Sequence, residues 1–165
     1  MRDHISELRI EPIAREHERA SFDCGKAPLN DYLYRHARQN DKKKISKTFV
    51  AVSNNNRVLG YYSLCTASIE FEELPEGIRK QLSPAALIAK LAVDESLCRQ
   101  GLGARLLIDA LQRIVSASSE IGIKAILVDT IGDEALEFYR HFEFIELPGQ
   151  HLKLFLPIET IQQLF

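Results

Sequence analysis

The residues from position 99 to position 104 have the composition of an anion-binding loop. They follow an apolar run that stops at Val93, and they open a long segment of helical periodicity. Glycine lets backbone N–H groups come close to phosphate oxygens, and a helix N-terminus adds a favourable dipole potential. A guanidinium beside the glycines adds a full positive charge. The candidate phosphate-binding residues are Arg99, Gln100, Gly101, Leu102, Gly103 and Ala104.

This loop differs from two common nucleotide-binding motifs. It lacks the Gly-Lys-Ser/Thr of a Walker loop, and Leu106 holds the position of the last glycine in Gly-x-Gly-x-x-Gly. A Gly-x-Gly before a helix also serves turn geometry alone in many α/β proteins. The pattern by itself therefore leaves both a phosphate site and a structural turn open.

Positive charge is concentrated between residues 35 and 47. Six basic side chains stand there against Asp41 alone, so the segment carries a net charge of +5 in a chain whose net charge is −2. Such a run is either a solvated helix end or a contact surface for a polyanion. The candidate polyanion-binding residues are Arg35, Arg38, Lys42, Lys43, Lys44 and Lys47, with Lys90 as a further one.

Length and composition limit the class of protein. A chain of 165 residues, 45% of them hydrophobic, suits one core, so we expect a single domain over residues 1–165. The sequence has no apolar run of about 18 residues and begins with polar residues, which predicts a cytoplasmic protein without a membrane span. The three cysteines, an odd number without CxxC spacing, are expected to be free thiols, and no His or Cys spacing predicts a metal site.

The expected helices and strands that carry these residues alternate along the chain. We expect a strand over residues 8–13, a helix over residues 28–40 that carries the basic segment at its end, and a hairpin of residues 49–53 and 58–65. A short helix is expected over residues 76–82, and a central strand over residues 87–93. A long helix follows Gly101 and reaches Ile121, with Gly122 as its left-handed cap.

The C-terminal part continues the alternation. Residues 125–128 read as a buried strand, and Asp133 is expected to cap a helix whose inner face is Ala135, Phe138, Tyr139 and Phe142. Residues 152–156 are expected to form a last strand, with a short helix after it. This order predicts an α+β fold in which helices flank a mixed sheet.

Residues 91–107 resemble the coenzyme A motif of GNAT acetyltransferases, which is Gln/Arg-x-x-Gly-x-Gly/Ala after the fourth strand. Both glycines are present, and Cys98 stands where the family has Gln or Arg. The pair Phe138-Tyr139 resembles the aromatic pair that precedes a terminal Gly-Phe in the family, with Glu143 in place of the glycine. The resemblance implies the GNAT fold and acetyl-CoA as cofactor.

Further motifs resemble the acetyltransferase toxins of bacterial toxin–antitoxin pairs. They are Phe-Asp-Cys-Gly at residues 22–25, Gly-Tyr-Tyr-Ser-Leu at residues 60–64 and Leu-Ala-Val-Asp at residues 91–94, and the match runs from about residue 22 to residue 156. This resemblance implies acetylation of the α-amine of aminoacyl-tRNA, which blocks translation. It also implies a small DNA-binding antitoxin, of ribbon-helix-helix type, as partner. The sequence leaves the oligomeric state open, with a homodimer as one candidate.

The resemblance to the GNAT family also implies roles for individual residues. Leu91, Ala92 and Val93 would contact the cofactor through their backbone, and Tyr139 would protonate the departing thiolate. An α-amine, with a pKa of about 7.7 to 8.0, is partly neutral at pH 7, whereas a lysine amine near about 10.4 would call for a positioned base. The strand over residues 87–93 offers no carboxylate, which favours the α-amine, although Glu70, Glu72 or Glu73 could approach from the preceding segment.

Two other functions stay open at this point. One is an acetyltransferase that acts on a small amine or a protein N-terminus. The other is a GNAT-fold binding module without catalysis, which the departures at Cys98 and Glu143 make conceivable.

Overall fold

The computed structural model describes residues 5–67, 77, 82–149 and 152–165. Within those ranges seven strands form one sheet in the order β1-β2-β3-β4-β5-β7-β6. The strands β4 and β5 run parallel, and the pairs β1–β2, β2–β3, β5–β7 and β6–β7 run antiparallel. The strands are β1 (Arg9–Pro12), β2 (Lys47–Val52), β3 (Val58–Thr66), β4 (Ala85–Val93), β5 (Ala125–Asp129), β6 (Ile145–Glu146) and β7 (Lys153–Pro157).

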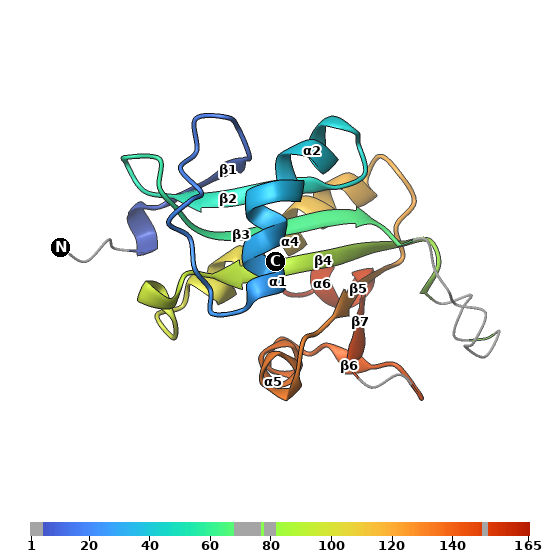
Figure 1. Ribbon diagram of the computed structural model, residues 1–165. Helices are drawn as coiled ribbons and strands as arrows, with labels where there is room; N and C mark the ends of the chain where they lie inside the picture. Colours follow the sequence, from blue (N-terminus) through green and yellow to red (C-terminus); the bar gives the residue numbers. More distant parts are fainter. Residues whose placement is uncertain (1–4, 68–76, 78–81, 150–151) are drawn as a thin grey trace. The chain divides into compact units, whose positions relative to one another are not determined.

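The helices lie between these strands in the chain, so the predicted α+β class with a mixed sheet is confirmed (Figure 1). They are η1 (Ile5–Glu7), α1 (Ala27–Asp31), η2 (Tyr32–His36), α2 (Ala37–Lys42), η4 (Glu95–Leu97), α4 (Leu102–Ser118), α5 (Asp133–His141) and α6 (Ile158–Gln162). In the part of the chain that the structure describes, none of the helices is long and apolar enough to span a membrane.

The chain divides into two compact units. The first unit consists of Met1–Cys65 and Lys90–Ala110, and the second of Thr66–Ala89 and Leu111–Phe165. Each has its own buried cluster of apolar side chains. The assignment of residues 1–165 to a single domain stays a prediction.

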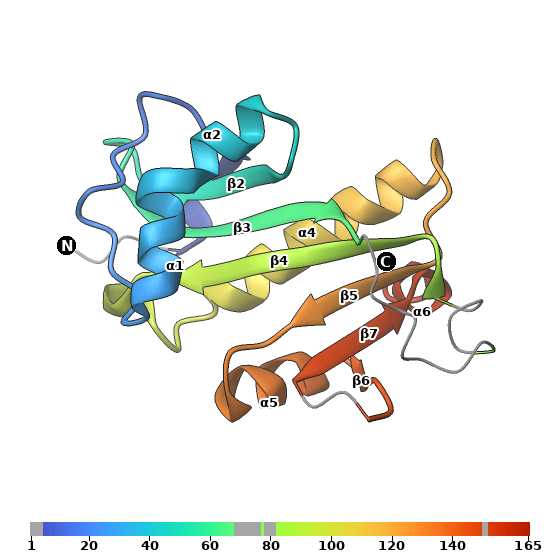
Figure 2. The same ribbon diagram turned by 45° about the vertical axis from the view of Figure 1, so that its right-hand side comes forward.

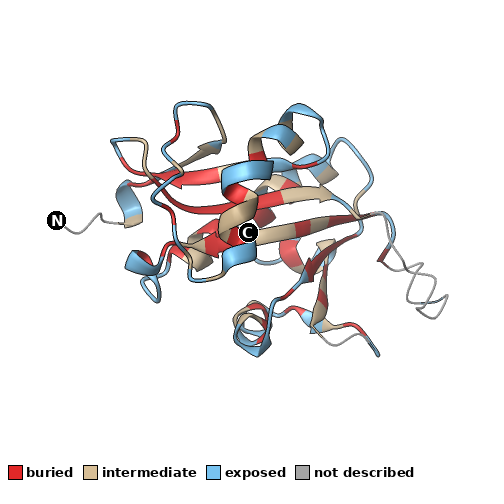
Figure 3. Ribbon diagram, in the orientation of Figure 1, coloured by how far each residue is buried: buried red, intermediate tan, exposed pale blue. Residues whose placement is uncertain are grey.

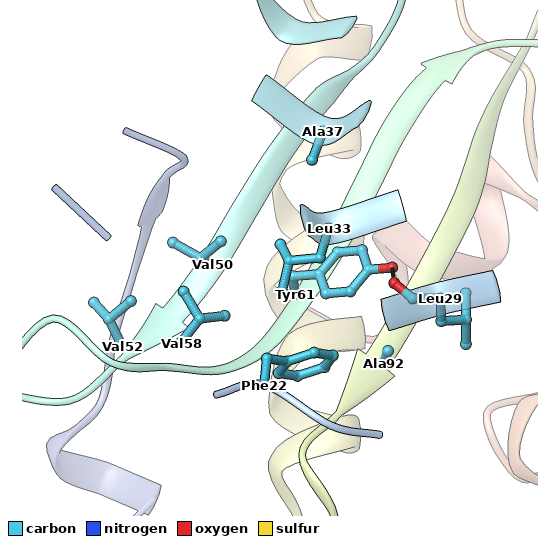
Figure 4. Close-up of a cluster of buried hydrophobic side chains, with 9 residues drawn as sticks. All are labelled: Phe22, Leu29, Leu33, Ala37, Val50, Val52, Val58, Tyr61 and Ala92. Carbon is cyan, nitrogen blue, oxygen red and sulfur yellow. Dashed lines mark hydrogen bonds between the residues drawn. The ribbon is translucent and has the colours of Figure 1, made fainter. Parts of the chain in front are cut away.

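In the first unit a continuous helical segment, α1–η2–α2, lies over strands β2 and β3 (Figure 1). Helical spacing places Leu29, Leu33 and Ala37 on its inner face, as the sequence predicted. These three side chains belong to one buried cluster with Tyr61 and the valines of the two strands. Figure 4 shows Leu33 beside the Tyr61 ring, and the Tyr61 hydroxyl donates to the Leu29 carbonyl at 2.7 Å. The buried apolar face therefore fixes the helical segment, and with it the basic residues at its end.

The other face of β3 packs against α4 within the same unit. Side chains alternate between the faces of a strand, so Gly60 and Tyr62 face away from Tyr61. A Cβ atom at Gly60 would lie 2.9 Å from Leu106 Cδ1, and the Tyr62 hydroxyl donates to Asp109 Oδ2 at 2.5 Å. The glycine of the Gly-Tyr-Tyr motif thus allows the first turns of α4 to approach the sheet.

The second unit is built on β5, whose residues Ala125 to Val128 are buried (Figure 3). β4 pairs with β5 in parallel at Ala85 to Ile88, and β7 pairs with the other edge of β5. Figure 2 shows β7 beside β6 and α5. Leu82, Ala85, Ala125, Leu127 and Leu147 form its apolar cluster. The buried strand and the last strand were predicted correctly, whereas the two-residue strand β6 was not foreseen.

Two predicted helix ends were wrong. α4 ends at Ser118, Ile121 is 59% exposed, and Gly122 has no positive φ, so it is not a left-handed cap. The hydroxyls of Ser118 and Ser119 instead donate to the carbonyls of Val115 and Ser116, which satisfies acceptors at the helix end.

At the start of α5 the N-cap is Gly132, with φ of 84°, and Asp133 is the first helical residue. The buried residues of this helix are Leu136 and Tyr139, so its inner face is centred one position away from the predicted Ala135. The helix expected over residues 76–82 falls mostly outside the described residues, as do Glu70, Glu72 and Glu73.

Candidate functional site

The glycine loop connects η4 to α4 through two left-handed residues. Arg99 has φ of 61° and Gly101 has φ of 91°, a backbone conformation that residues with a Cβ atom rarely adopt. Buried Leu97 on one side, and buried Leu102 and Leu106 on the other, anchor the loop in the apolar interior of the first unit. The loop geometry is therefore set by packing on both flanks and by glycine at position 101.

The backbone N–H groups at the start of α4 are available to a ligand. The first bond into the helix runs from the Arg105 N–H to the Gly101 carbonyl at 3.1 Å. None of the described carbonyls accepts a bond from the N–H groups of Gly101, Leu102, Gly103 or Ala104. Unsatisfied N–H groups at a helix N-terminus favour an anion, and exposed Arg99 stands next to them. These residues fit a phosphate group.

Arg105, one turn into α4, is engaged elsewhere. Its Nη2 donates to the Leu8 carbonyl at 2.6 Å, and its Nη1 donates to the carbonyl of Ile5. The guanidinium thus ties the N-terminal segment to α4. Of the two arginines near the loop, Arg99 is the one that faces solvent.

The strand that leads into the loop is paired with β5 over only part of its length. The ladder runs from Ala85↔Ala125 to Ile88↔Val128, and β4 continues to Val93. Leu91 and Val93 are half-buried and Ala92 is buried. The three predicted cofactor-contacting residues thus lie on the part of β4 beyond its pairing with β5.

The basic segment is exposed along most of its length. Lys42, Lys43, Lys44 and Lys47 are exposed, and Arg38 is half-buried. Among the described residues, two of the six basic side chains have carboxylate partners: Arg35 Nε lies 3.0 Å from Asp31 Oδ1, and Lys47 Nζ lies 3.2 Å from Asp41 Oδ1. Exposed ion pairs of this kind are weak and exchange readily with another anion.

Lys90 lies outside that segment in the sequence, on β4. Its Nζ lies 5.2 Å from the centroid of the Tyr32 ring, within the range of a cation–π contact. The Tyr32 hydroxyl lies 2.8 Å from Ser46 Oγ. Burial alone would raise the pKa of Tyr32, but hydrogen bonds from Ser46, Ser63 and Asn40 outweigh it and lower the pKa. The ammonium is thus held over an aromatic ring whose own position is fixed.

Tyr139 lies in the second unit, on α5, and is 6% exposed. Its ring packs edge-to-face on Phe138 and Phe144, with centroid distances of 5.1 Å and 5.3 Å. Burial raises the pKa of the phenol well above its ordinary value, so the hydroxyl stays protonated at neutral pH. This is the state that a proton donor needs.

Sequence reasoning missed the role of Asp94, which directly follows β4. Its buried carboxylate accepts hydrogen bonds from the Asp23 N–H at 3.0 Å and from the Ser96 N–H at 3.0 Å. The Phe-Asp-Cys-Gly motif and the start of the glycine loop therefore share one carboxylate. The only signal in the sequence was that both motifs matched the same family.

All three cysteines, Cys24, Cys65 and Cys98, are free, as predicted. Burial raises the pKa of the Cys24 and Cys65 thiols. Cys98 is exposed at the base of the glycine loop. It occupies a loop position without anchoring the fold.

Comparison with known proteins decides which family this loop belongs to. Residues 44–146 match the acetyltransferase (GNAT) domain family, a stretch that includes β2 to β6 and the whole glycine loop. The chain belongs to the GNAT acetyltransferase family. The GNAT fold and the acetyltransferase class that the sequence motifs implied are thereby confirmed.

Two of the similar proteins are described as acting on tRNA or as complexed with it. A tRNA-acetylating toxin of Mycobacterium tuberculosis is 37% identical over 147 residues, which cover 87% of this chain and 88% of the toxin. The solved structure of the AtaT toxin complexed with acetyl-methionyl-tRNAfMet is 32% identical, with a TM-score of 0.85 over 96% of this chain and 99% of that one.

A second similar structure shows the same toxin with its antitoxin. A tyrosine-to-phenylalanine variant of AtaT, bound to the C-terminus of the antitoxin AtaR and acetyl-CoA, is 31% identical to this GNAT chain. It has a TM-score of 0.84 and covers 96% of this chain and 98% of that one.

Proposed function

We propose that this chain transfers the acetyl group of acetyl-CoA to the α-amine of aminoacyl-tRNA and thereby blocks translation as a toxin. The observation that carries the proposal is the match, over 96% of the chain, to AtaT complexed with acetyl-methionyl-tRNAfMet. The tRNA-acetylating toxin of Mycobacterium tuberculosis supports the same reaction from sequence.

The glycine loop would hold the phosphates of the cofactor. Acetyl-CoA supplies an acyl group activated as a thioester, which an amine can attack directly. The free N–H groups of residues 101–104 and the Arg99 guanidinium match the charge of a pyrophosphate. Leu91, Ala92 and Val93 would contact the cofactor through backbone groups that β5 does not pair.

Tyr139 is proposed as the general acid. Its Oη carries a proton at neutral pH and would donate it to the thiolate that leaves. The proposal rests on the Phe-Tyr pair shared with the family. The tyrosine-to-phenylalanine variants of AtaT and KacT among the similar structures are in keeping with a role for a tyrosine in those toxins.

The residues of β4 favour an acceptor amine that needs no strong base for its deprotonation. The described strand β4, Ala85–Val93, contains no carboxylate, and an α-amine with a pKa of about 7.7 to 8.0 is partly neutral at pH 7. The proposed RNA contacts are Arg35, Arg38, Lys42, Lys43, Lys44, Lys47 and Lys90. The basic segment would bind phosphates of the tRNA, and Lys90 would add a cation on β4.

The partner of such a toxin is an antitoxin. AtaT has been solved with the C-terminus of the antitoxin AtaR, and a further structure is the KacTA–DNA complex. We propose a DNA-binding antitoxin of ribbon-helix-helix type for this chain, a homodimeric state, and action in the cytoplasm where charged tRNA is found. Co-purification with the product of a neighbouring gene would test the first of these.

One assay separates the proposed acceptor from its alternatives. Labelled acetyl-CoA is offered in parallel with charged tRNA, uncharged tRNA, free amino acids and polyamines. Label on charged tRNA alone is the expected result. Label on polyamines or free amino acids but never on charged tRNA would contradict the tRNA assignment, and no label anywhere would favour a binding module.

A further inference from the structure

The Asp94 carboxylate joins two segments that lie far apart in the sequence. Oδ2 accepts a bond from the Asp23 N–H at 3.0 Å, a contact across 71 positions of the chain. Oδ1 accepts bonds from the Ser96 N–H at 3.0 Å and the Ser96 hydroxyl at 2.7 Å. One oxygen therefore holds the segment before α1, and the other holds the segment that opens the glycine loop.

The segment on the Oδ2 side is itself held in a fixed shape. Asp23 Oδ1 accepts bonds from the Gly25 N–H at 2.8 Å and from Asn30 Nδ2 at 2.9 Å. Asn30 Oδ1 accepts a bond from the Cys24 N–H at 2.9 Å. Since Asn30 lies on α1, these bonds pass the position of Asp94 on to the helical segment that ends in the basic residues.

The segment on the Oδ1 side leads straight into the cofactor loop. Asp94 caps η4, the short helix whose last residue, Leu97, is followed by Cys98 and Arg99. A second contact ties the two sides, because the Glu95 N–H donates to the Asp23 carbonyl at 2.8 Å. Gly25, with φ of 82°, lies so close that a Cβ atom there would approach Glu95 Oε1.

The charge of Asp94 is maintained although the residue is 4% exposed. Burial would raise the pKa of the carboxyl, but the hydrogen bonds from Asp23 and Ser96 outweigh it and lower the pKa. The carboxylate is thus ionised at neutral pH, and its hydrogen bonds are charge-assisted, which makes them stronger than neutral ones.

We propose that Asp94 is a positioning residue for two parts of the molecule. It holds the glycine loop and helix α1, the start of the helical segment that ends in the basic residues, in one arrangement, so that its loss weakens binding of both substrates. The proposal rests on the proposed function for the identity of the second substrate. Support of this kind by residues behind the binding groups is a general requirement for a preorganised site.

Two variants test it, with acetyl-CoA affinity measured by calorimetry and the KM for aminoacyl-tRNA measured by acetyl transfer. Asp94→Ala removes both oxygens. We expect the acetyl-CoA dissociation constant and the KM for aminoacyl-tRNA each to rise about tenfold, the effect of one charge-assisted bond, with kcat at saturation within about threefold. Asp94→Asn keeps one acceptor oxygen, so one of the two constants should rise while the other stays near the native value.

Asp109→Asn is the matched control. Asp109 accepts a bond from Tyr62 in the same unit but lies away from the loop, so its change should lower the melting temperature and leave both constants unaltered. Ser96→Ala removes one loop-side bond and should weaken acetyl-CoA binding about two- to threefold with no change in the KM for tRNA.

A merely structural role would lower the melting temperature without moving either constant. If both constants of Asp94→Asn stay within about twofold of native, the proposal is wrong, and this variant decides alone where Asp94→Ala does not fold. The calorimetric arm needs no acceptor. A native chain that binds acetyl-CoA but acetylates no tRNA would overturn the proposed function. In that case the acetyl-CoA affinities of Asp94→Ala and Ser96→Ala would still test whether Asp94 positions the glycine loop.

Discussion

Two buried tyrosines differ in what their hydroxyls can do. Burial raises the pKa of both Tyr61 and Tyr139. The Tyr61 hydroxyl donates to the Leu29 carbonyl at 2.7 Å, so its proton is committed to holding α1 on the sheet. No hydrogen bond joins the Tyr139 hydroxyl to another of the described residues. A protonated phenol without an internal acceptor suits a donor better than a structural tie.

Replacing Tyr139 by Phe keeps the ring and deletes only the hydroxyl. We expect kcat to fall by about 10²- to 10⁴-fold, the usual contribution of a general acid, with little change in melting temperature. Tyr61→Phe is the control, because it deletes a buried hydrogen bond and should lower stability by about 1 kcal/mol while turnover is kept. If Tyr139→Phe retains near-native turnover, the phenol only packs.

At the scale of elements, the glycine loop depends on how closely α4 approaches β3. Gly60 leaves room for Leu106 and Leu102, whose δ-methyls would lie 2.9 Å and 3.2 Å from a Cβ atom there. Leu102 is also the first residue of α4, so the packing that seats the helix seats the N-terminal N–H groups as well. The position of the glycine loop therefore depends on the buried contact of Gly60 with Leu102 and Leu106.

A side chain at Gly103 should block the phosphate site and spare the fold. Gly103→Val places bulk between the N–H groups of the first turn and the cofactor, so acetyl-CoA affinity should fall at least about tenfold by calorimetry. Gly122→Ala is the control, because a Cβ atom there meets only Pro84 Cγ at 3.7 Å, an ordinary contact. Unchanged affinity in Gly103→Val would exclude the loop from the site.

Local sequence patterns predicted helices and strands, but they could not predict contacts between residues that are far apart in the sequence. Helical spacing found α4 and the inner face of α1–η2–α2, because burial of one face imposes that period. The same spacing continued in the sequence to Ile121, although α4 ends at Ser118. Asp94 could not be found this way, since nothing in the period of either segment encodes a bond across 71 positions.

Over the whole molecule, charge is divided unevenly. Residues 35–47 carry a net charge of +5 in a chain of −2, so the remaining residues carry −7. The described basic residues of this segment lie on η2, α2, the turn after α2, and the first residue of β2. A polyanion is attracted to such a segment and repelled by the rest of the surface, which favours one mode of approach.

Removal of three of these charges should change the salt dependence of tRNA acetylation. Binding to RNA releases condensed counterions, so the KM for tRNA should rise steeply with salt, and Lys42→Ala, Lys43→Ala and Lys44→Ala together should reduce the slope by about one per lost contact. Changing Lys26, Lys124 and Lys153 to Ala removes the same charge elsewhere and should leave the slope closer to native. Equal slopes in both triple variants would remove the segment from the RNA contact.

In the proposed reaction the acetyl group goes to the α-amine of the amino acid carried by tRNA. The most direct measurement is mass spectrometry of the 3′-terminal fragment after nuclease digestion of reacted aminoacyl-tRNA. A matched substrate is the same tRNA with its aminoacyl group converted to the α-hydroxy acyl group, which has no amine. We expect one added acetyl group on the aminoacyl-adenosine fragment and none on the hydroxy analogue. Acetyl groups on both substrates, or on neither while free amines are acetylated, would contradict it.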